Sequence, residues 1–169
     1  HHVRSLTSVP LVLVDCFGMH GASLYDWHVP LQYRLEVGKT LQAPQELKPI
    51  SLERILQATW PAGYRFHQEP HPVWLEYRAI LEHAEQHGWQ GDWQGFDATQ
   101  WYASLRHTVQ LDTIHPTAQV SPICAVVGGL VGNEVIKFLS GKGEPVNNAL
   151  LFDGQRAWNY RVEPRDKGE

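Results

Sequence analysis

Three glycines lie close together near the C-terminal end of the chain, at Gly128, Gly129 and Gly132. Glycine-rich turns with the pattern G-x-G-x-x-G bind the pyrophosphate of dinucleotides, and an acidic residue about 20 positions further on binds the ribose. Asp153 lies at about that distance. The pattern nevertheless fails in detail, because Val127 stands where the first glycine belongs. The sequence therefore makes a dinucleotide site the weaker alternative.

A helix is the better interpretation of the same segment. Ser121 can cap a helix and Pro122 suits its first turn, so we expect a helix that contains the glycines and ends at Gly141. The later letters SGKG form no phosphate-binding loop, because Ile136 lies five residues before Gly141, where that motif needs glycine. Glycine costs about 1 kcal/mol in a helix interior relative to alanine, so several glycines on one face indicate close packing against another backbone. We predict an interface or packing face formed by Ala125, Gly128, Gly129 and Gly132.

Two histidines, His83 and His87, lie one turn apart on another predicted helix, as two zinc ligands can. The metalloprotease pattern needs a glutamate directly after the first histidine, and Ala84 occupies that place. The spacing indicates no third ligand, and glutamate and glutamine side chains share the face. We expect a solvated polar surface and no metal site.

The two cysteines, Cys16 and Cys124, are far apart in the sequence, and each lies in an apolar run. A helix N-terminus would lower the pKa of the Cys124 thiol, but no basic residue is nearby in the sequence. Their separation in the sequence matches neither a zinc ligand set nor a CxxC redox pair. We therefore interpret the cysteines as small buried apolar residues and reduced thiols of an intracellular protein. We assign no catalytic residue.

Length and composition describe an ordinary globular chain. Its 169 residues are 43% hydrophobic and include seven tryptophans, enough for one domain or a piece of a larger one. A net charge of −4 argues against nucleic acid as a partner. The longest apolar stretch, residues 122–132, is shorter than the ~20 residues of a membrane span, so we expect no membrane either.

The elements that must position these residues fall into three zones of one domain, residues 1–37, 38–115 and 116–169. In the first zone, residues 9–18 predict a buried strand, and the alternation in residues 22–29 and 31–37 predicts two more. The second zone is expected to be a helical insertion. The third is expected to hold the glycine-containing helix and two strands, residues 147–153 and 156–164, with Gly154 in the turn between them. These strands predict an α/β or α+β fold, with a mixed sheet from both chain ends.

Capping residues and apolar periodicity define the helices of the second zone. Ser51 can cap a helix over residues 52–60, and Asp97 with Gln100 can form a capping box for a third helix. The clearest helix lies within residues 70–88 and ends at Gly88. Its apolar face follows three- and four-residue spacing: Val73, Trp74, Tyr77, Ile80, Leu81 and Ala84.

Residues 121–154 resemble the C-terminal part of the small, non-catalytic subunit of the SUMO-activating enzyme. The marks are Pro122 before small residues, the glycine pair, the letters EVIK at 134–137, SGKGEP at 140–145, NN at 147–148 and FDG at 152–154. Residues 12–26 also resemble the strand, turn and strand that follow the Rossmann half of that family. The resemblance is loose over 38–115. The inactive adenylation half of ubiquitin-activating enzymes shares the glycine helix and is the nearest alternative.

The resemblance implies a supporting role in an enzyme, not catalysis by this chain. In that family the large partner subunit holds ATP, Mg²⁺ and the catalytic cysteine, and it adenylates the modifier before forming a thioester. We therefore expect no cofactor in this chain, the catalytic large subunit as its partner, a SUMO-type modifier as an indirect partner, and a location in the nucleus, with the cytoplasm left open. The fold would be the C-terminal part of a Rossmann-like inactive adenylation domain, with a free sheet edge and an exposed face on the glycine helix. A stand-alone nucleotide-binding protein is the alternative from another class.

Overall fold

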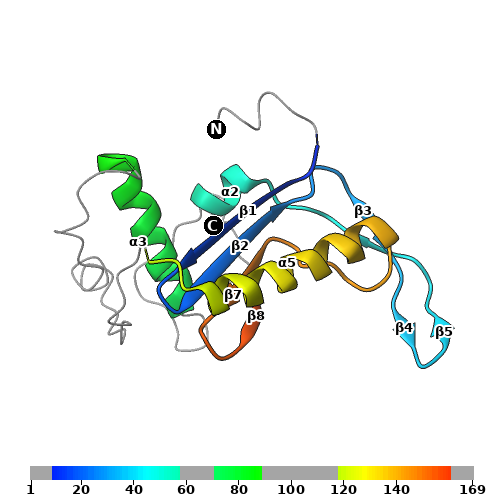
Figure 1. Cartoon of the computed structure of the whole chain (residues 1–169). Helices are drawn as coiled ribbons and strands as arrows, with labels where there is room; N and C mark the ends of the chain where they lie inside the picture. The colour runs from blue at the N-terminus through cyan, green and yellow to red at the C-terminus, as the bar shows by residue number, and fades with distance from the viewer. Residues whose placement is uncertain (1–8, 58–70, 89–117, 161–169) are drawn as a thin grey trace.

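The computed structural model describes residues 9–57, 71–88 and 118–160. Its centre is a four-stranded sheet with the order β1-β2-β7-β8 (Figure 1). The strands are β1 (Leu11–Phe17), β2 (His20–Asp26), β7 (Ala149–Phe152) and β8 (Ala157–Tyr160). Both ends of the chain therefore contribute to one sheet, as the sequence predicted.

The direction of the strands differs from the predicted mixed sheet. Each neighbouring pair, β1 with β2, β2 with β7 and β7 with β8, runs antiparallel. The parallel contacts of the described residues are two isolated bridges, Gly18 with Gln119 and Arg34 with Lys142. The prediction was wrong on this point because strand periodicity does not encode the direction of a neighbour. A Rossmann-like domain, which needs parallel strands, stays a prediction.

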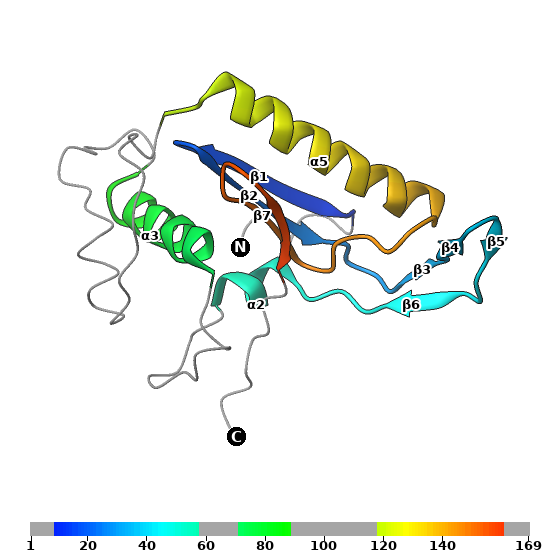
Figure 2. The ribbon, with the colours of Figure 1, turned by 90° about the horizontal axis from the view of Figure 1, so that it is seen from below.

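Helices cover both faces of the sheet. The long helix α5 (Ser121–Ser140) lies along one face, and α2 (Leu52–Gln57) and α3 (Pro72–His87) lie on the other (Figure 2). Successive side chains of a strand point to opposite faces, so β1 contributes to both layers. Leu13 and Phe17 pack in the cluster around α3, whereas Val12 and Cys16 pack in clusters with side chains of α5.

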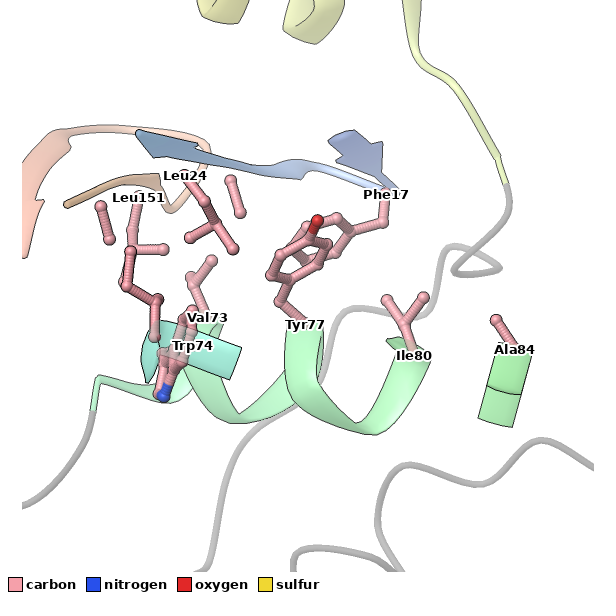
Figure 3. Packing of buried hydrophobic residues seen from close by; sticks show 11 residues of the cluster. Phe17, Leu24, Val73, Trp74, Tyr77, Ile80, Ala84 and Leu151 are labelled. Atoms are coloured by element: carbon pink, nitrogen blue, oxygen red, sulfur yellow. The ribbon is translucent and has the colours of Figure 1, made fainter. Parts of the chain in front are cut away.

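The apolar face of α3 forms the larger core, as its spacing predicted. Trp74 and Tyr77 are fully buried, and the Tyr77 ring stacks on Phe17 at a centroid distance of 5.4 Å (Figure 3). The other residues of the predicted apolar face also pack in this core: Val73, Ile80 and Ala84 are buried, and Leu81 is partly buried against the cluster. Burial of these side chains against Leu24 and Leu151 holds α3 on the sheet.

The second zone begins with two short strands, not with the expected helices, and each pairs with a strand of the first zone. Strand β3 (Leu31–Tyr33) pairs with β6 (Gln45–Leu47), and β4 (Glu36–Val37) forms a short hairpin with β5 (Thr40–Leu41) beyond them. The strand predicted over residues 31–37 is thus two short strands, β3 and β4. Figure 2 shows both pairs extending from one end of the molecule. The two-residue turn of the hairpin has Gly38 at φ 67°, a conformation that glycine adopts without steric cost. This local signal for a hairpin was missed.

The predicted helix ends are close to those observed. Helix α5 has Val120 at its N-cap position, with no side-chain capping bond, one residue before the predicted cap Ser121. It ends at Gly141, whose φ is 64° and whose N–H donates to Lys137 O. Helix α3 ends at Gly88 with φ 77°, and the Ser51 hydroxyl accepts the Arg54 N–H at 3.4 Å in the first turn of α2. The predicted capping box of Asp97 and Gln100 and its helix lie outside the described residues.

Candidate protein interface

Helix α5 packs on the sheet with one side only. Ile123 and Val127 are buried in a cluster with Phe152, and Val127 is only 1% exposed. The opposite side, here called the outer face of α5, is exposed along the length of the helix. Its members recur at three- and four-residue spacing, and all but Asn133 are small or apolar: Ala125, Val126, Gly128, Gly129, Gly132, Asn133, Ile136 and Leu139. Ile136 and Leu139 are 64% and 75% exposed, which is high for large aliphatic side chains.

The glycines of the outer face have empty space beside them. A Cβ atom placed on Gly128, Gly129 or Gly132 would meet no heavy atom within 4 Å. Gly21 of β2 provides the contrast, because a Cβ there would lie 2.5 Å from Val127 Cγ2. The close approach between helix and sheet thus depends on Gly21. The described part of this chain leaves the predicted packing face open, so its role as an interface stays a prediction.

The geometry counts against a dinucleotide at the glycines. All three lie inside α5, beyond the first turn, where backbone N–H groups are hydrogen-bonded within the helix and do not face a ligand. The acidic residue of the alternative, Asp153, is engaged elsewhere. Its carboxylate accepts hydrogen bonds from the backbone N–H groups of Gln155 and Arg156 and from Trp158 Nε1.

A buried carboxylate connects α5 to the segment that follows it. Glu134 is only 4% exposed, and its Oε2 accepts a hydrogen bond from the Val146 backbone N–H at 2.8 Å. Lys137 Nζ donates to Glu134 Oε1 at 2.7 Å. Glu134 and Lys137 are the first and last residues of the EVIK motif noted in the sequence. Their contacts fix how the chain leaves the helix and enters β7.

The C-terminal end of α5 extends the outer face toward the hairpin. A cavity of about 450 Å³ lies there, lined by Gln32, Tyr33, Arg34, Leu41, Pro44, Ser140, Gly141 and Lys142. Leu41 in β5 is 48% exposed. Exposed apolar side chains from the helix and the hairpin therefore lie at the same end of the molecule.

The two histidines of α3 lie side by side. The rings of His83 and His87 lie 4.4 Å apart between centroids; His87 is exposed and His83 is intermediate in exposure. The described residues contain no group of three or more histidine, cysteine, aspartate or glutamate side chains that could hold a metal ion. The absence of a metal site from the chain stays a prediction.

The cysteines lie next to each other, which sequence reasoning did not predict. Cys16 of β1 and Cys124 of α5 are both free and intermediate in exposure, and the Cys124 thiol is near enough to affect the pKa of Cys16. Burial raises the pKa of the Cys16 thiol to about 12, with further contributions from Cys124 and from the charge of Asp15. Both cysteines were predicted to be small buried apolar residues; both are instead only partly buried, and Cys16 packs against the Ile123 cluster.

Helix α5 also meets the length and composition of a membrane span. An 18-residue window of it has a mean hydropathy of 1.5, and 17% of that window is buried in the chain. This corrects our expectation that no segment is long enough. The expectation counted an uninterrupted apolar run, and it stopped at Asn133 although further apolar residues follow Glu134.

Comparison with known proteins gives one consistent result. No family model matches the chain. It is 49% identical over 39 residues to SUMO-activating enzyme subunit 1A of Arabidopsis thaliana, covering 23% of this chain and 12% of that protein. Subunit 1B-1 of the same plant is 56% identical over 34 residues (20% and 11%), and human SUMO-activating enzyme subunit 1 is 44% identical over 39 residues (23% and 11%).

The matches therefore span only about an eighth or less of the length of each relative. Their identity of 44% to 56% is nevertheless high, and the plant and vertebrate proteins are all named as forms of subunit 1 of the SUMO-activating enzyme. The resemblance predicted from residues 121–154 is confirmed at this level: over a short segment, the chain is similar to subunit 1 of SUMO-activating enzymes.

Proposed function

We propose that this chain takes part in the activation of a SUMO-type modifier, as the C-terminal portion of a small, non-catalytic subunit. The observation that carries the proposal is the similarity, up to 56% identical over 34 residues, to proteins named SUMO-activating enzyme subunit 1. In the proposed complex the large subunit binds ATP and Mg²⁺, adenylates the modifier and forms the thioester. The chain's own contribution is assembly.

The outer face of α5 is the proposed contact with the large subunit. The name "subunit 1" of the relatives implies a second subunit, which supplies a partner for an exposed surface. Stable interfaces have an apolar centre that is poor in charged residues. The outer face fits this description, because Gly128 to Gly132 offer close backbone approach and Ile136 and Leu139 offer apolar area to bury.

A protein partner suits this face better than a lipid bilayer does. One side of α5 packs on strands β1 and β2, so a spanning helix would carry that sheet into the hydrocarbon. Unpaired backbone groups at a sheet edge would then lose their hydrogen bonds to water, at several kcal/mol each. The buried Glu134, which accepts the Val146 N–H, would also lie within the span.

The chemistry of Cys16 supports a non-catalytic role. A nucleophilic cysteine needs a thiolate, and burial of Cys16 beside Cys124 and Asp15 raises its pKa to about 12. Purified alone, the chain is expected to show no modifier-dependent exchange between ATP and pyrophosphate and to form no thioester. An exchange signal would contradict the non-catalytic assignment.

Co-purification with the catalytic subunit tests the interface. Gly132→Leu adds a side chain into open space, so the isolated chain should still fold and melt at the same or a higher temperature, whereas the complex should weaken. Gly132→Ala should keep most of the binding. Gln86→Leu is the matched control, since it adds the same exposed side chain to α3 on the opposite layer.

Two outcomes would count against the proposal in different ways. A Gly132→Leu chain that binds the catalytic subunit like the unchanged chain would remove the outer face of α5 from the interface and leave the family role intact. Micromolar binding of ATP or NAD to the chain, measured by calorimetry and lost in both Gly132 variants, would favour the stand-alone nucleotide-binding alternative.

A further inference from the structure

The sheet and α5 bring Cys16 and Cys124 together across 107 intervening residues. Cys16 is the register partner of Gly21 in the β1–β2 pair. Val127 Cγ2 lies 2.5 Å from the position of a Cβ on Gly21, so α5 touches the sheet at this point. Cys124 precedes Val127 by three residues and therefore lies on the same side of the helix, one turn nearer its N-terminus.

The surroundings of the two thiols agree with this placement. Cys16 packs against the cluster of Ile123, Val127 and Phe152, and β1 places its side chain on the α5 side of the sheet. The Cys124 thiol is near enough to Cys16 to contribute to the raised pKa of the Cys16 thiol. Neither cysteine is fully buried, so a small oxidant can reach the pair.

We propose that Cys16 and Cys124 form a redox-sensitive pair, which a hydroperoxide converts into a disulfide that fastens the first turn of α5 to β1. The inference does not depend on the proposed function, because it rests on the contact between two elements of this chain. The relevant consequence is mechanical: oxidation would hold in place the helix that carries the exposed outer face.

The reaction balances with hydrogen peroxide as the oxidant. The Cys124 thiolate sulfur attacks one peroxide oxygen, the O–O bond breaks, and the departing hydroxide takes up a proton to leave as water. Cys124 is then a sulfenic acid. The Cys16 sulfur attacks the Cys124 sulfur, the S–O bond breaks, and the hydroxyl group leaves as a second water with the Cys16 proton. Two thiols are oxidised by two electrons in total, and one peroxide is reduced to two waters.

Cys124 is the better attacking thiol of the two. Cys16, near the end of β1, is the poorer nucleophile, because burial, the neighbouring Cys124 thiol and the negative charge of Asp15 raise the pKa of its thiol. Cys124 lies in the first turn of α5. Cys16 therefore acts as the resolving thiol.

Oxidation of the purified chain in its folded state tests the pair. The chain is treated with hydrogen peroxide, the remaining thiols are blocked with an alkylating reagent, and the peptides are mapped without reduction. We expect a monomer that has lost two hydrogen atoms, a peptide linking Cys16 to Cys124, and a higher midpoint of thermal unfolding that returns to its original value after reduction. The same treatment in urea should give far less of the linked peptide.

Single variants keep the result interpretable. Cys16→Ser should accumulate sulfenic acid at Cys124, detectable with a dimedone probe, and Cys124→Ser should form no intramolecular link. Both serine variants should still fold, because each replaces a partly exposed thiol with a group of similar size. The proposal is overturned if the folded chain forms no more Cys16–Cys124 link than the urea-unfolded chain, or if the oxidised product is a disulfide-linked dimer.

Discussion

The Glu134 carboxylate in α5 accepts a hydrogen bond from the backbone N–H of Val146, at 2.8 Å, in a part of the chain that is shielded from water. The two residues are twelve positions apart and belong to different segments. The bond therefore determines where the chain turns back after α5 and how β7 enters the sheet beside β2. A buried acceptor with this role should be costly to remove.

Glu134→Ala should lower the free energy of unfolding by about 1–3 kcal/mol, because it leaves the Val146 N–H buried without an acceptor. Glu134→Gln is the matched variant, since its amide oxygen can still accept that bond while the ion pair with Lys137 is lost. Urea unfolding measures both. An equal loss of unfolding free energy in the two variants would show that the charge of Glu134, not its hydrogen bond to Val146, stabilises the fold.

Gly21→Ala should destabilise the chain by about 1–3 kcal/mol, because the added methyl group would lie 2.5 Å from Val127 Cγ2 in a packed interior. Val127 cannot turn away easily, since β-branched side chains have one strongly preferred rotamer in a helix. Gly128→Ala serves as the control. It points into open space and should be neutral or stabilising by up to about 1 kcal/mol. Thermal melts that rank the two variants in the opposite order would contradict the proposed contact between α5 and β2.

Trp74→Ala should cost about 3–5 kcal/mol, the range for truncating a large buried aromatic side chain. His83→Ala on the same helix should change stability by no more than about 0.5 kcal/mol, because its ring lies against His87 at the surface of α3. Thermal or urea unfolding compares them. The metal alternative would be reopened by a large loss of stability in His83→Ala, together with added zinc that stabilises the unchanged chain but not the variant.

Asp153 should contribute a pH-dependent part of the stability. Partial burial disfavours its charged form, but hydrogen bonds from Trp158 Nε1 and from the N–H groups of Arg156 and Gln155 outweigh this, with help from His71, and lower the pKa of Asp153 from 3.8 to about 2. A depressed pKa means that the stabilisation is present above about pH 4 and is lost as the pH falls toward 2.

The test compares the unchanged chain with Asp153→Asn by urea unfolding at several pH values. The stability difference between the two should be largest at neutral pH and should shrink as the pH falls from about 4 to about 2. A difference that stays constant over this interval would mean that the turn hydrogen bonds do not depend on the charge of Asp153.

The sequence by itself determined the elements that depend on local interactions. Apolar spacing and Gly88 defined α3, and Pro122 and Gly141 bounded α5 to within one residue at its start. Continuous apolar runs marked β1 and β7. These signals suffice because helix periodicity, caps and buried strands are properties of neighbouring residues.

Only the tertiary structure decided the relationships between distant segments. Three features are of this kind: the order and direction of the strands, the contact of Cys16 with Cys124, and the hydrogen bond from Val146 to Glu134. Each joins residues that are far apart in the sequence, and no local sequence pattern predicts such a pairing. The same is true of the outer face of α5. Glycines inside a helix indicated close packing, and the fold shows that the sheet takes the other side of the helix, because Ile123 and Val127 bury more apolar area there than small residues could.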